Sequence, residues 1–190
     1  IKPILFNTED VKAILDGRKT HTRRVVNKEY LGMADIEDNK IYVPTEDGGC
    51  INILNTTWSK YKVGDILYVR ETFNTFSNIT MDNEVGVIYK ADNKEVIMPC
   101  NRDYECEYVF NDKWKPSIHM PKKYARIFLK VTNVRVERLQ DMNMYEETGS
   151  LNIFKHKKYY DNWNSTAKDG YRWEDNPYIF VYEFERIHDV

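Results

Sequence analysis

The chain contains little cysteine, glycine or proline, with three, eight and six residues of these types among 190. The cysteines, Cys50, Cys100 and Cys106, do not show the spacing of about two to four intervening residues that is typical of zinc sites. An odd number of cysteines, with no secretion signal at the start of the sequence, favours reduced thiols. We therefore expect a cytoplasmic protein with neither a metal site nor a cofactor.

Long apolar runs are also absent, because no stretch of about 18 apolar residues occurs. We therefore expect no membrane partner. Charged residues make up 31% of the chain and aromatic residues 14%, which is typical of a soluble domain with a sizeable core. A net charge of −2 argues against general binding of polyanions.

The charges are unevenly distributed along the sequence. Residues 17–28 contain no acid, residues 113–138 are strongly basic, and residues 81–107 are mainly acidic. This pattern predicts either one basic face of the molecule or ordinary solvated strand faces.

The densest group of functional side chains is the segment 17–24, which reads G-R-K-T-H-T-R-R. After its glycine it holds four basic side chains, two hydroxyls and a histidine. Such donors bind phosphate, carboxylate or nucleobase groups. The segment is therefore the first candidate binding site, and its ligand-facing residues would be Arg18, Lys19, Thr20, Thr22, Arg23 and Arg24.

A short helix is expected immediately before this segment. Thr8 is the expected N-cap, the apolar residues of 11–15 have helical spacing, and Gly17 suits the position after the C-cap. The basic segment then continues as an extended strand into residues 25–26. Because a helix C-terminus repels anions, an anion bound here would depend on the side chains.

Alternating and β-branched residues predict several other strands, at 3–6, 66–73, 85–90, 125–131, 133–138 and 178–187. A short helix is expected at 139–148, whereas 152–176 show no clear period. Many short strands with two or three small helices predict an α+β fold around a barrel-like sheet. We expect one domain over residues 1–190, with long loop insertions around 27–60, 74–115 and 150–176.

Glu71 shares a face of strand 66–73 with Val69 and Phe73, opposite Arg70. A carboxylate on an apolar face needs a cationic partner. Lys19 and Arg24 are the partners that we consider. Glu71 would then serve either as half of a structural ion pair or as a general base.

Gly17, Lys19, Thr22 and Arg24 follow the pattern G-x-K-x-x-[ET]-x-R, and residues 63–67 supply a V-G-D strand. Together these motifs resemble the ASCH domains of the PUA-like superfamily. Further segments resemble phage and prophage ASCH-like proteins over nearly the whole chain, namely residues 2–6, 14–20, 64–72, 114–121, 125–129, 134–141 and 176–187. The resemblance implies a small β-barrel with short flanking helices and a cleft between barrel and helix.

The resemblance also implies binding of RNA or a nucleotide. Some small bacterial relatives look like amidohydrolases that deacetylate acetylated cytidine with a Lys, a Thr and a later Glu. Lys19 and Thr22 match the first two positions. The third falls near Ser150, where Glu147, next to Glu146, is the nearest candidate. Like-charged neighbours favour the basic form of the Lys19 amine, whereas Thr22 could act as a nucleophile only with a base within reach.

The loop 114–121 is a further candidate contact because its two prolines fix it. Trp114 could stack on a base, and Ser117 and His119 could form hydrogen bonds. Alternatively, Trp114 and Ile118 close the end of the barrel. Arg70 and Glu71 complete the predicted ligand-facing set, and residues 155–160 are either a nucleic-acid contact or plain surface.

Three functions remain open from the sequence. The first is binding of RNA, a nucleotide or a modified nucleoside by a monomer through Lys19, Thr22, Arg24 and the loop 114–119. The second is an amidohydrolase acting on an acylated cytidine-like nucleoside. The third is a protein-interaction module of phage origin that binds a host protein in the host cytoplasm.

Overall fold

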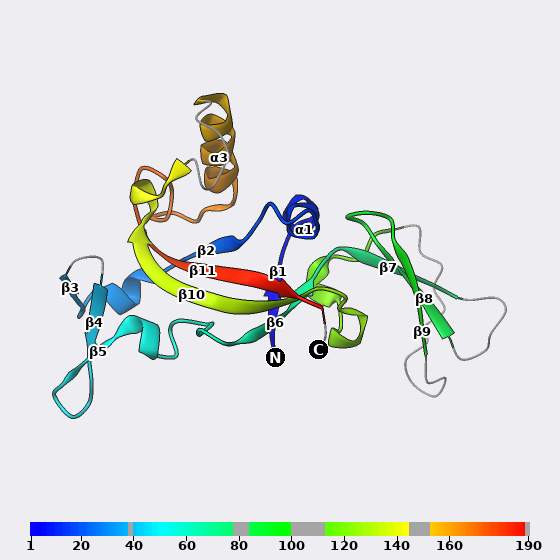
Figure 1. Ribbon diagram of the computed structural model, residues 1–190. Helices are drawn as coiled ribbons and strands as arrows, with labels where there is room; N and C mark the ends of the chain where they lie inside the picture. Colours follow the sequence, from blue (N-terminus) through cyan, green and yellow to red (C-terminus); the bar gives the residue numbers. More distant parts are fainter. Residues whose placement is uncertain (38–39, 78–83, 100–112, 145–152, 189–190) are drawn as a thin grey trace. The chain divides into compact units, whose positions relative to one another are not determined.

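Strands make up most of the secondary structure, and two α-helices accompany them in the part of the chain that the computed structural model describes, residues 1–37, 40–77, 84–99, 113–144 and 153–188 (Figure 1). The predicted α+β class is therefore confirmed. Within these residues the strands form three separate sheets and no closed barrel. None of their helices is long and apolar enough to cross a membrane.

The chain divides into two compact units, each built from stretches that are distant in sequence. Unit 1 comprises Ile1–Thr20, Gly64–Val131 and Phe184–Val190, and unit 2 comprises His21–Val63 and Thr132–Glu183. The basic segment 17–24 is therefore divided between the units after Thr20.

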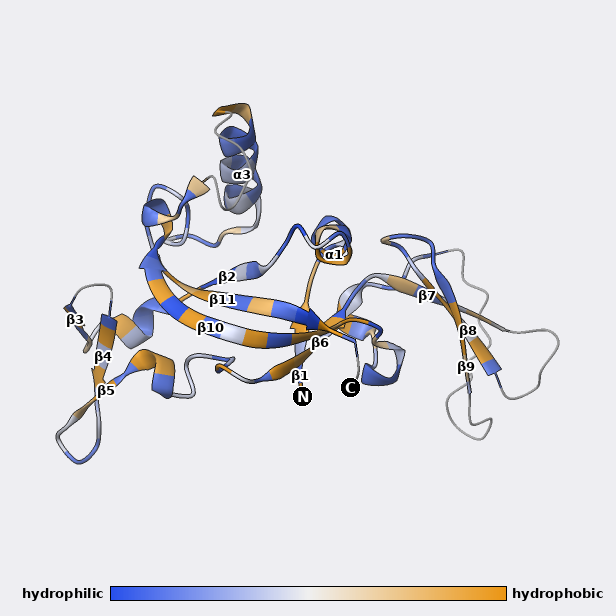
Figure 2. Cartoon of the chain, viewed as in Figure 1, coloured by the Kyte–Doolittle hydropathy of each residue, from blue (hydrophilic) through white to orange (hydrophobic). Residues whose placement is uncertain are grey.

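The largest sheet has five strands in the order β1-β6-β10-β11-β2. β1 runs parallel to β6, β10 is antiparallel to β6, and β2 is antiparallel to β11. The strands are β1 Lys2–Leu5, β2 His21–Val25, β6 Ile66–Arg70, β10 Phe128–Arg138 and β11 Tyr178–Ile187. Hydrophobic and hydrophilic residues alternate along β10 (Figure 2), as expected for a strand with one buried face.

Each unit also contains a three-stranded antiparallel sheet. In unit 1 this sheet consists of β7 Phe73–Ser77, β8 Glu84–Tyr89 and β9 Glu95–Pro99. In unit 2 it consists of β3 Asp35–Glu37, β4 Lys40–Pro44 and β5 Cys50–Asn52. Apart from Phe73, both sheets lie within the segments expected to be insertions.

Three of the sequence-based boundaries were wrong. The expected strand 66–73 ends at Arg70, and Phe73 begins β7, where it pairs with Tyr89. The expected strands 125–131 and 133–138 are one strand, β10, which begins at Phe128 and continues without a break through the exposed Thr132 and Asn133. The region without a clear period contains helix α3, Ile153–Thr166.

Helix α1, Thr8–Leu15, has the expected end but a different start. Its N-cap is Asn7, whose side chain accepts a hydrogen bond from the Asp10 amide at 2.8 Å, and not Thr8. At its C-terminus Gly17 adopts φ +71°, and the amides of Gly17 and Arg18 donate to the carbonyls of Ile14 and Ala13. This pair of bonds is the Schellman ending that the glycine predicts.

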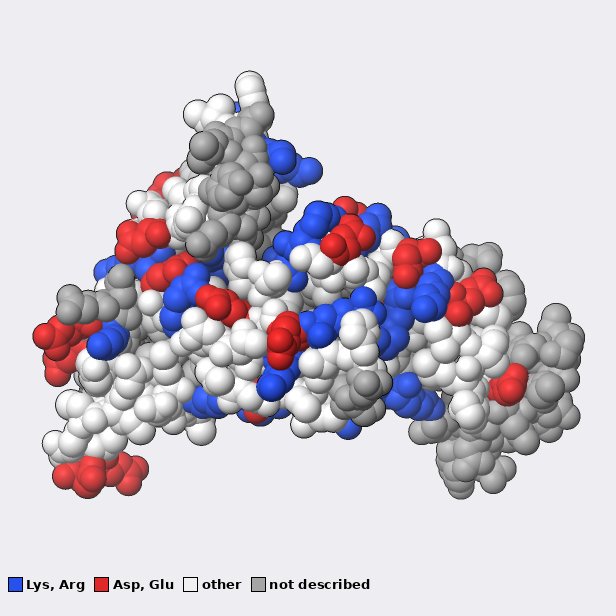
Figure 3. All heavy atoms as spheres, in the orientation of Figure 1, with Lys and Arg blue, Asp and Glu red and all other residues white. Residues whose placement is uncertain are grey.

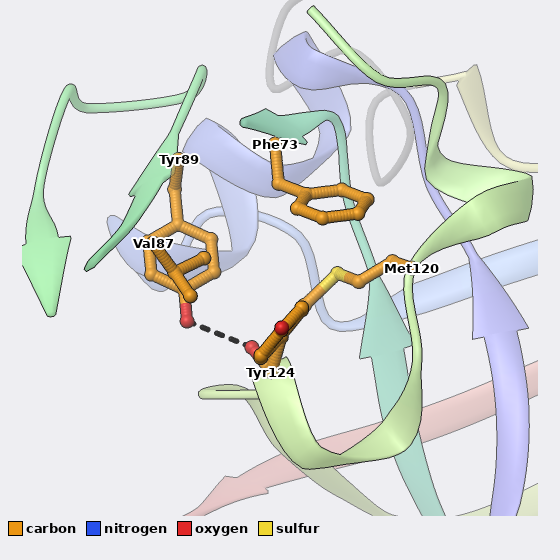
Figure 4. Close-up of a cluster of buried hydrophobic side chains, with 5 residues drawn as sticks. All are labelled: Phe73, Val87, Tyr89, Met120 and Tyr124. Carbon is orange, nitrogen blue, oxygen red and sulfur yellow. Dashed lines mark hydrogen bonds between the residues drawn. The ribbon is translucent and has the colours of Figure 1, made fainter. Parts of the chain in front are cut away.

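Each unit contains a cluster of buried hydrophobic side chains. In unit 1 the cluster joins β7 and β8 to the segment 120–124, and the Tyr89 hydroxyl donates to the Tyr124 carbonyl at 2.7 Å (Figure 4). In unit 2 the cluster consists of Leu139, Met142, Ile179 and Val181. Tyr159 and Trp163 of α3 pack against this cluster, and this contact attaches the helix to the β11 strand.

Candidate functional site: a basic and aromatic pocket

Residues 17–20, the part of the basic segment in unit 1, are balanced by acids of helix α1 and of its C-cap. Arg18 pairs with Asp16 at 2.7 Å, and the Lys19 ammonium lies 3.3 Å from the Asp10 carboxylate. The Lys19 side chain is only 18% exposed. Lys19 therefore has a local acidic partner that the sequence interpretation did not consider.

The unit 2 part lies on β2, where neighbouring arginines have different environments. The Arg23 side chain is only 3% exposed, and its Nε lies 3.4 Å from a Glu137 oxygen. Arg24 is exposed, and its Nη1 donates at 2.7 Å to both the Thr22 hydroxyl and the Arg23 carbonyl. Thr22 is buried, so its hydroxyl holds the guanidinium of Arg24 in position. Arg23 is therefore a buried residue with an acidic partner, whereas Arg24 is exposed.

A pocket of about 540 Å³ opens beside Arg24, entirely within unit 2. Its volume lies in the range of small-molecule sites, about 300–1,000 Å³. One wall comes from β2 and the residues after it, and the other from the end of α3 and the turn that follows (Figure 1). It is lined by Arg23, Arg24, Val25, Asn27, Trp163, Thr166, Ala167, Lys168 and Tyr171.

The aromatic walls of this pocket are held by hydrogen bonds within unit 2. The Trp163 indole nitrogen donates to the Tyr171 carbonyl at 2.9 Å. The Tyr171 hydroxyl accepts from the Lys28 amide at 2.9 Å and donates to the Asn27 side-chain oxygen at 3.3 Å. The pocket lining therefore combines preformed aromatic surfaces with three basic residues, the buried Arg23 and the exposed Arg24 and Lys168.

The predicted loop 114–121 lies in unit 1 and contains a short 3-10 turn, Ser117–His119. Arg70 is brought to it, because its guanidinium donates to the Ile118 carbonyl. Trp114 is half-buried beneath the Lys90 ammonium, 5.9 Å from the ring centre. Ile118 is 59% exposed, so the interpretation that it closes a barrel end is wrong; Met120 is the buried residue of this loop.

Glu71 is buried as expected, at 1% exposure, but the partners considered for it, Lys19 and Arg24, were wrong. Arg126 pairs with Glu71 and donates to both of its carboxylate oxygens at 2.9 Å. The same guanidinium donates to both oxygens of Asp92, at 2.8 and 2.9 Å. Strand periodicity places Glu71 inside, but it does not identify which distant cation meets it.

The pKa values of Glu71 and Asp92, the two carboxyl groups bound by Arg126, are shifted in opposite directions. Burial raises the pKa of Glu71 above its ordinary value, and the hydrogen bonds from Arg126 oppose this rise. Burial also acts to raise the pKa of the more exposed Asp92, but the hydrogen bonds from Arg126 and from the Lys94 amide, together with the charge of Arg126, outweigh it, so the pKa of Asp92 is lowered. The arrangement suits a structural ion pair, one of the two roles considered for Glu71.

Basic residues of β10 also face acids. Lys130 lies 4.0 Å from Glu185 in unit 1, and in unit 2 Arg135 pairs with Glu137 at 3.1 Å and with Glu183. Figure 3 shows Lys and Arg next to Asp and Glu over β10 and β11. The basic run 113–138 therefore does not give β10 a uniformly basic face.

The sequence interpretation missed most of the pocket. Asn27, Trp163, Lys168 and Tyr171 were not singled out, because the region of α3 has no apolar stripe that marks a helix. Its abundance of Lys, Asn and Tyr was the only available signal. The singled-out residues 155–160 lie earlier in α3 and do not line the pocket.

Several candidate residues lie outside the described part of the chain. These are Cys100, Cys106, Glu146 and Glu147, and with the last two the end of the expected helix 139–148, from residue 145 on. In the described part of that expected helix, Leu139–Asp141 form a 3-10 turn. Among the described residues, no group of three or more His, Cys, Asp or Glu side chains could hold a metal ion. Comparison of the chain with protein-family models, with curated proteins and with solved structures finds no match.

Proposed function

We propose that the pocket of unit 2 binds a nucleotide, either alone or as part of an RNA strand. The observation that carries this proposal is the meeting of two cations, Arg24 and Lys168, with two fixed aromatic side chains, Trp163 and Tyr171. A guanidinium can hold a phosphate through two parallel hydrogen bonds. Aromatic side chains provide stacking surfaces for any nucleobase.

The motif resemblance supports the same proposal independently. Thr22 and Arg24 are the ASCH motif positions that lie on β2, and Arg24 lines the pocket. We further propose that the β-rich chain is a PUA-like domain of the ASCH type that acts in the cytoplasm.

Binding is better supported than amide hydrolysis. Lys19 is engaged by Asp10 at 3.3 Å, and the Thr22 hydroxyl accepts a hydrogen bond from Arg24. A nucleophilic Thr needs a neighbouring base, whereas this contact is with a permanently charged donor. The observed contacts give Thr22 a positioning role toward Arg24.

Isothermal titration with AMP and with a short single-stranded RNA tests the proposal. Arg24→Gln removes a charge-assisted phosphate contact, which should raise the dissociation constant about 10-fold or more. Lys157→Gln is the matched control, because it removes the same charge from exposed surface of α3 outside the pocket. Equal affinities of the two variants, or no binding by the unmodified protein, would rule the proposal out.

A further inference from the structure

The geometry points to a pocket that recognises the phosphate and the ring of a nucleotide without reading the edge of its base. This inference rests on the proposed function and adds to it the class of ligand. The amide, hydroxyl and indole groups of the described lining residues are already engaged by neighbours within unit 2. Among these residues the lining then offers a ligand charge and flat apolar surface.

Among the residues that the structure describes, Asn27 is the only amide side chain that lines the pocket, and an amide is the usual reader of adenine. Its oxygen accepts from the Glu29 amide at 3.1 Å and from the Tyr171 hydroxyl at 3.3 Å. Its nitrogen donates to the Glu29 carboxylate at 3.2 Å. Asn27 therefore caps the 3-10 helix Lys28–Leu31, and reading a base would require these bonds to break.

The aromatic and hydroxyl groups are engaged in the same way. The Trp163 indole N–H donates to the Tyr171 carbonyl, and the Tyr171 hydroxyl both donates and accepts. The Thr166 hydroxyl donates to the Trp163 carbonyl at 3.2 Å. These side chains can therefore offer a ligand their surfaces, but their hydrogen-bond donors are occupied.

Backbone groups at the pocket wall are also engaged. The Ala167 and Tyr171 amides donate at 3.0 Å to the carbonyls of Trp163 and Lys168. The Asn27 carbonyl accepts from the Tyr30 amide, also at 3.0 Å. Reading a base through these three backbone groups would likewise require local hydrogen bonds to open.

The expected ligand is therefore any nucleotide with at least one phosphate. Arg24 and Lys168 would hold the phosphate, and Trp163 and Tyr171 would contact the base. Selectivity of about 10-fold or more between bases normally requires a hydrogen-bonded edge, which contributes about 1–3 kcal/mol. Without such an edge, the four ribonucleotides should bind alike.

Titrations of AMP, CMP, GMP and UMP, each with its unphosphorylated nucleoside, test this inference. We expect the four dissociation constants to agree within about 3-fold and each nucleoside to bind at least about 10-fold more weakly. One nucleotide binding more than about 10-fold tighter than the others would overturn the inference and leave the proposed function intact. Absence of binding by all four would overturn both.

Asn27→Ser separates capping from base reading. Serine is a good N-cap, so the local fold is retained while the amide is lost. We expect the affinities of all four nucleotides to change by the same factor. A selective loss for one of them would show that Asn27 reads its base, which contradicts the inference.

Discussion

Arg126 shows how a single side chain can satisfy two acids. Its guanidinium donates to both oxygens of Glu71, which is 1% exposed, and to both oxygens of Asp92. The Arg126 guanidinium also lies 4.0 Å from the centre of the Tyr89 ring. The residue therefore connects three parts of unit 1.

Arg126→Met should reduce the free energy of unfolding by about 3–5 kcal/mol, because a buried Glu71 carboxylate would lose its partner. Lys130→Met is the matched control, since Lys130 is 51% exposed and lies 4.0 Å from Glu185. It should cost about 0–1 kcal/mol. Urea denaturation measures both, and an equal loss in the two variants would contradict the structural role of Arg126.

Tyr89 predicts a sensitivity to alkaline pH. Burial raises the pKa of its phenol above the ordinary value of 10.0. The folded state therefore keeps the proton that the unfolded chain releases, so this stabilisation is complete below pH 10 and is lost as the pH rises further. The loss should be about 1.4 kcal/mol per pH unit.

Urea denaturation of the unmodified protein and of Tyr89→Phe at about pH 9 and pH 11 measures this contribution. Tyr89→Phe loses one hydrogen bond, worth about 1 kcal/mol. Its free energy of unfolding should nevertheless fall less between the two pH values than that of the unmodified protein. Identical falls would show that Tyr89 does not carry the effect.

Single residues could be predicted in part. The sequence indicated that Glu71 is buried and needs a cation from the alternation of the expected strand 66–73, and the burial is correct although β6 ends one residue earlier, at Arg70. The identity of that cation depends on a contact 55 positions away in sequence, with Arg126. For the same reason, Arg24 could be proposed as a ligand-facing residue from its motif, but its neighbours Trp163 and Tyr171 could not.

Among the elements, β8 depends on a glycine at a close cross-strand contact. Gly86 pairs with Phe76 of β7, and a β-carbon added to Gly86 would lie 2.3 Å from the Phe76 ring. The Phe76 ring therefore packs directly on Gly86, and it can do so only because residue 86 has no side chain. Sequence composition alone gives this glycine no special role.

Gly86→Ala should destabilise the protein by about 1–3 kcal/mol through overpacking against Phe76. Gly32→Ala is the control, because Gly32 has helical φ −63° and an added β-carbon would meet only the Glu29 carbonyl, at 3.8 Å. Its effect should be within about 0.5 kcal/mol. Thermal denaturation compares the two, and a neutral Gly86→Ala would contradict the packing described for β8.

Elements with a clear local signal were predicted well. Residues 178–187 and the end of α1 at Gly17 are correct, because a β-rich run and a C-terminal glycine are local features. Helix α3 was missed because it has no buried residue and is attached by the half-buried Tyr159 and Trp163. Tertiary packing, rather than an amphipathic pattern, stabilises such a helix.

For the whole molecule, the sequence indicated the α+β class but not the grouping of strands into three sheets, which depends on pairings distant in sequence. The charge distribution on the surface likewise depends on contacts between residues that are distant in sequence. In the described part of the chain, several cations of the basic runs, among them Lys19, Lys130 and Arg135, meet acids in the fold. Nucleic-acid binding should therefore be local to the pocket instead of spread over a broad basic face.

This local binding predicts a weak dependence on salt. If Arg24 and Lys168 contact phosphates of a single strand, the logarithm of the RNA association constant should fall with the logarithm of salt concentration at a slope of about −1.4. Fluorescence anisotropy of a labelled oligonucleotide over a salt series gives this slope. A slope steeper than about −3 would indicate many more phosphate contacts than the pocket offers.

The most direct test of the central claim is a crystal structure of the protein with bound AMP. The account predicts that the phosphate lies within hydrogen-bond distance of the Arg24 guanidinium and that the adenine contacts Trp163 and Tyr171. AMP found instead at Lys19 or at the loop 114–119, with an empty pocket in unit 2, would contradict it.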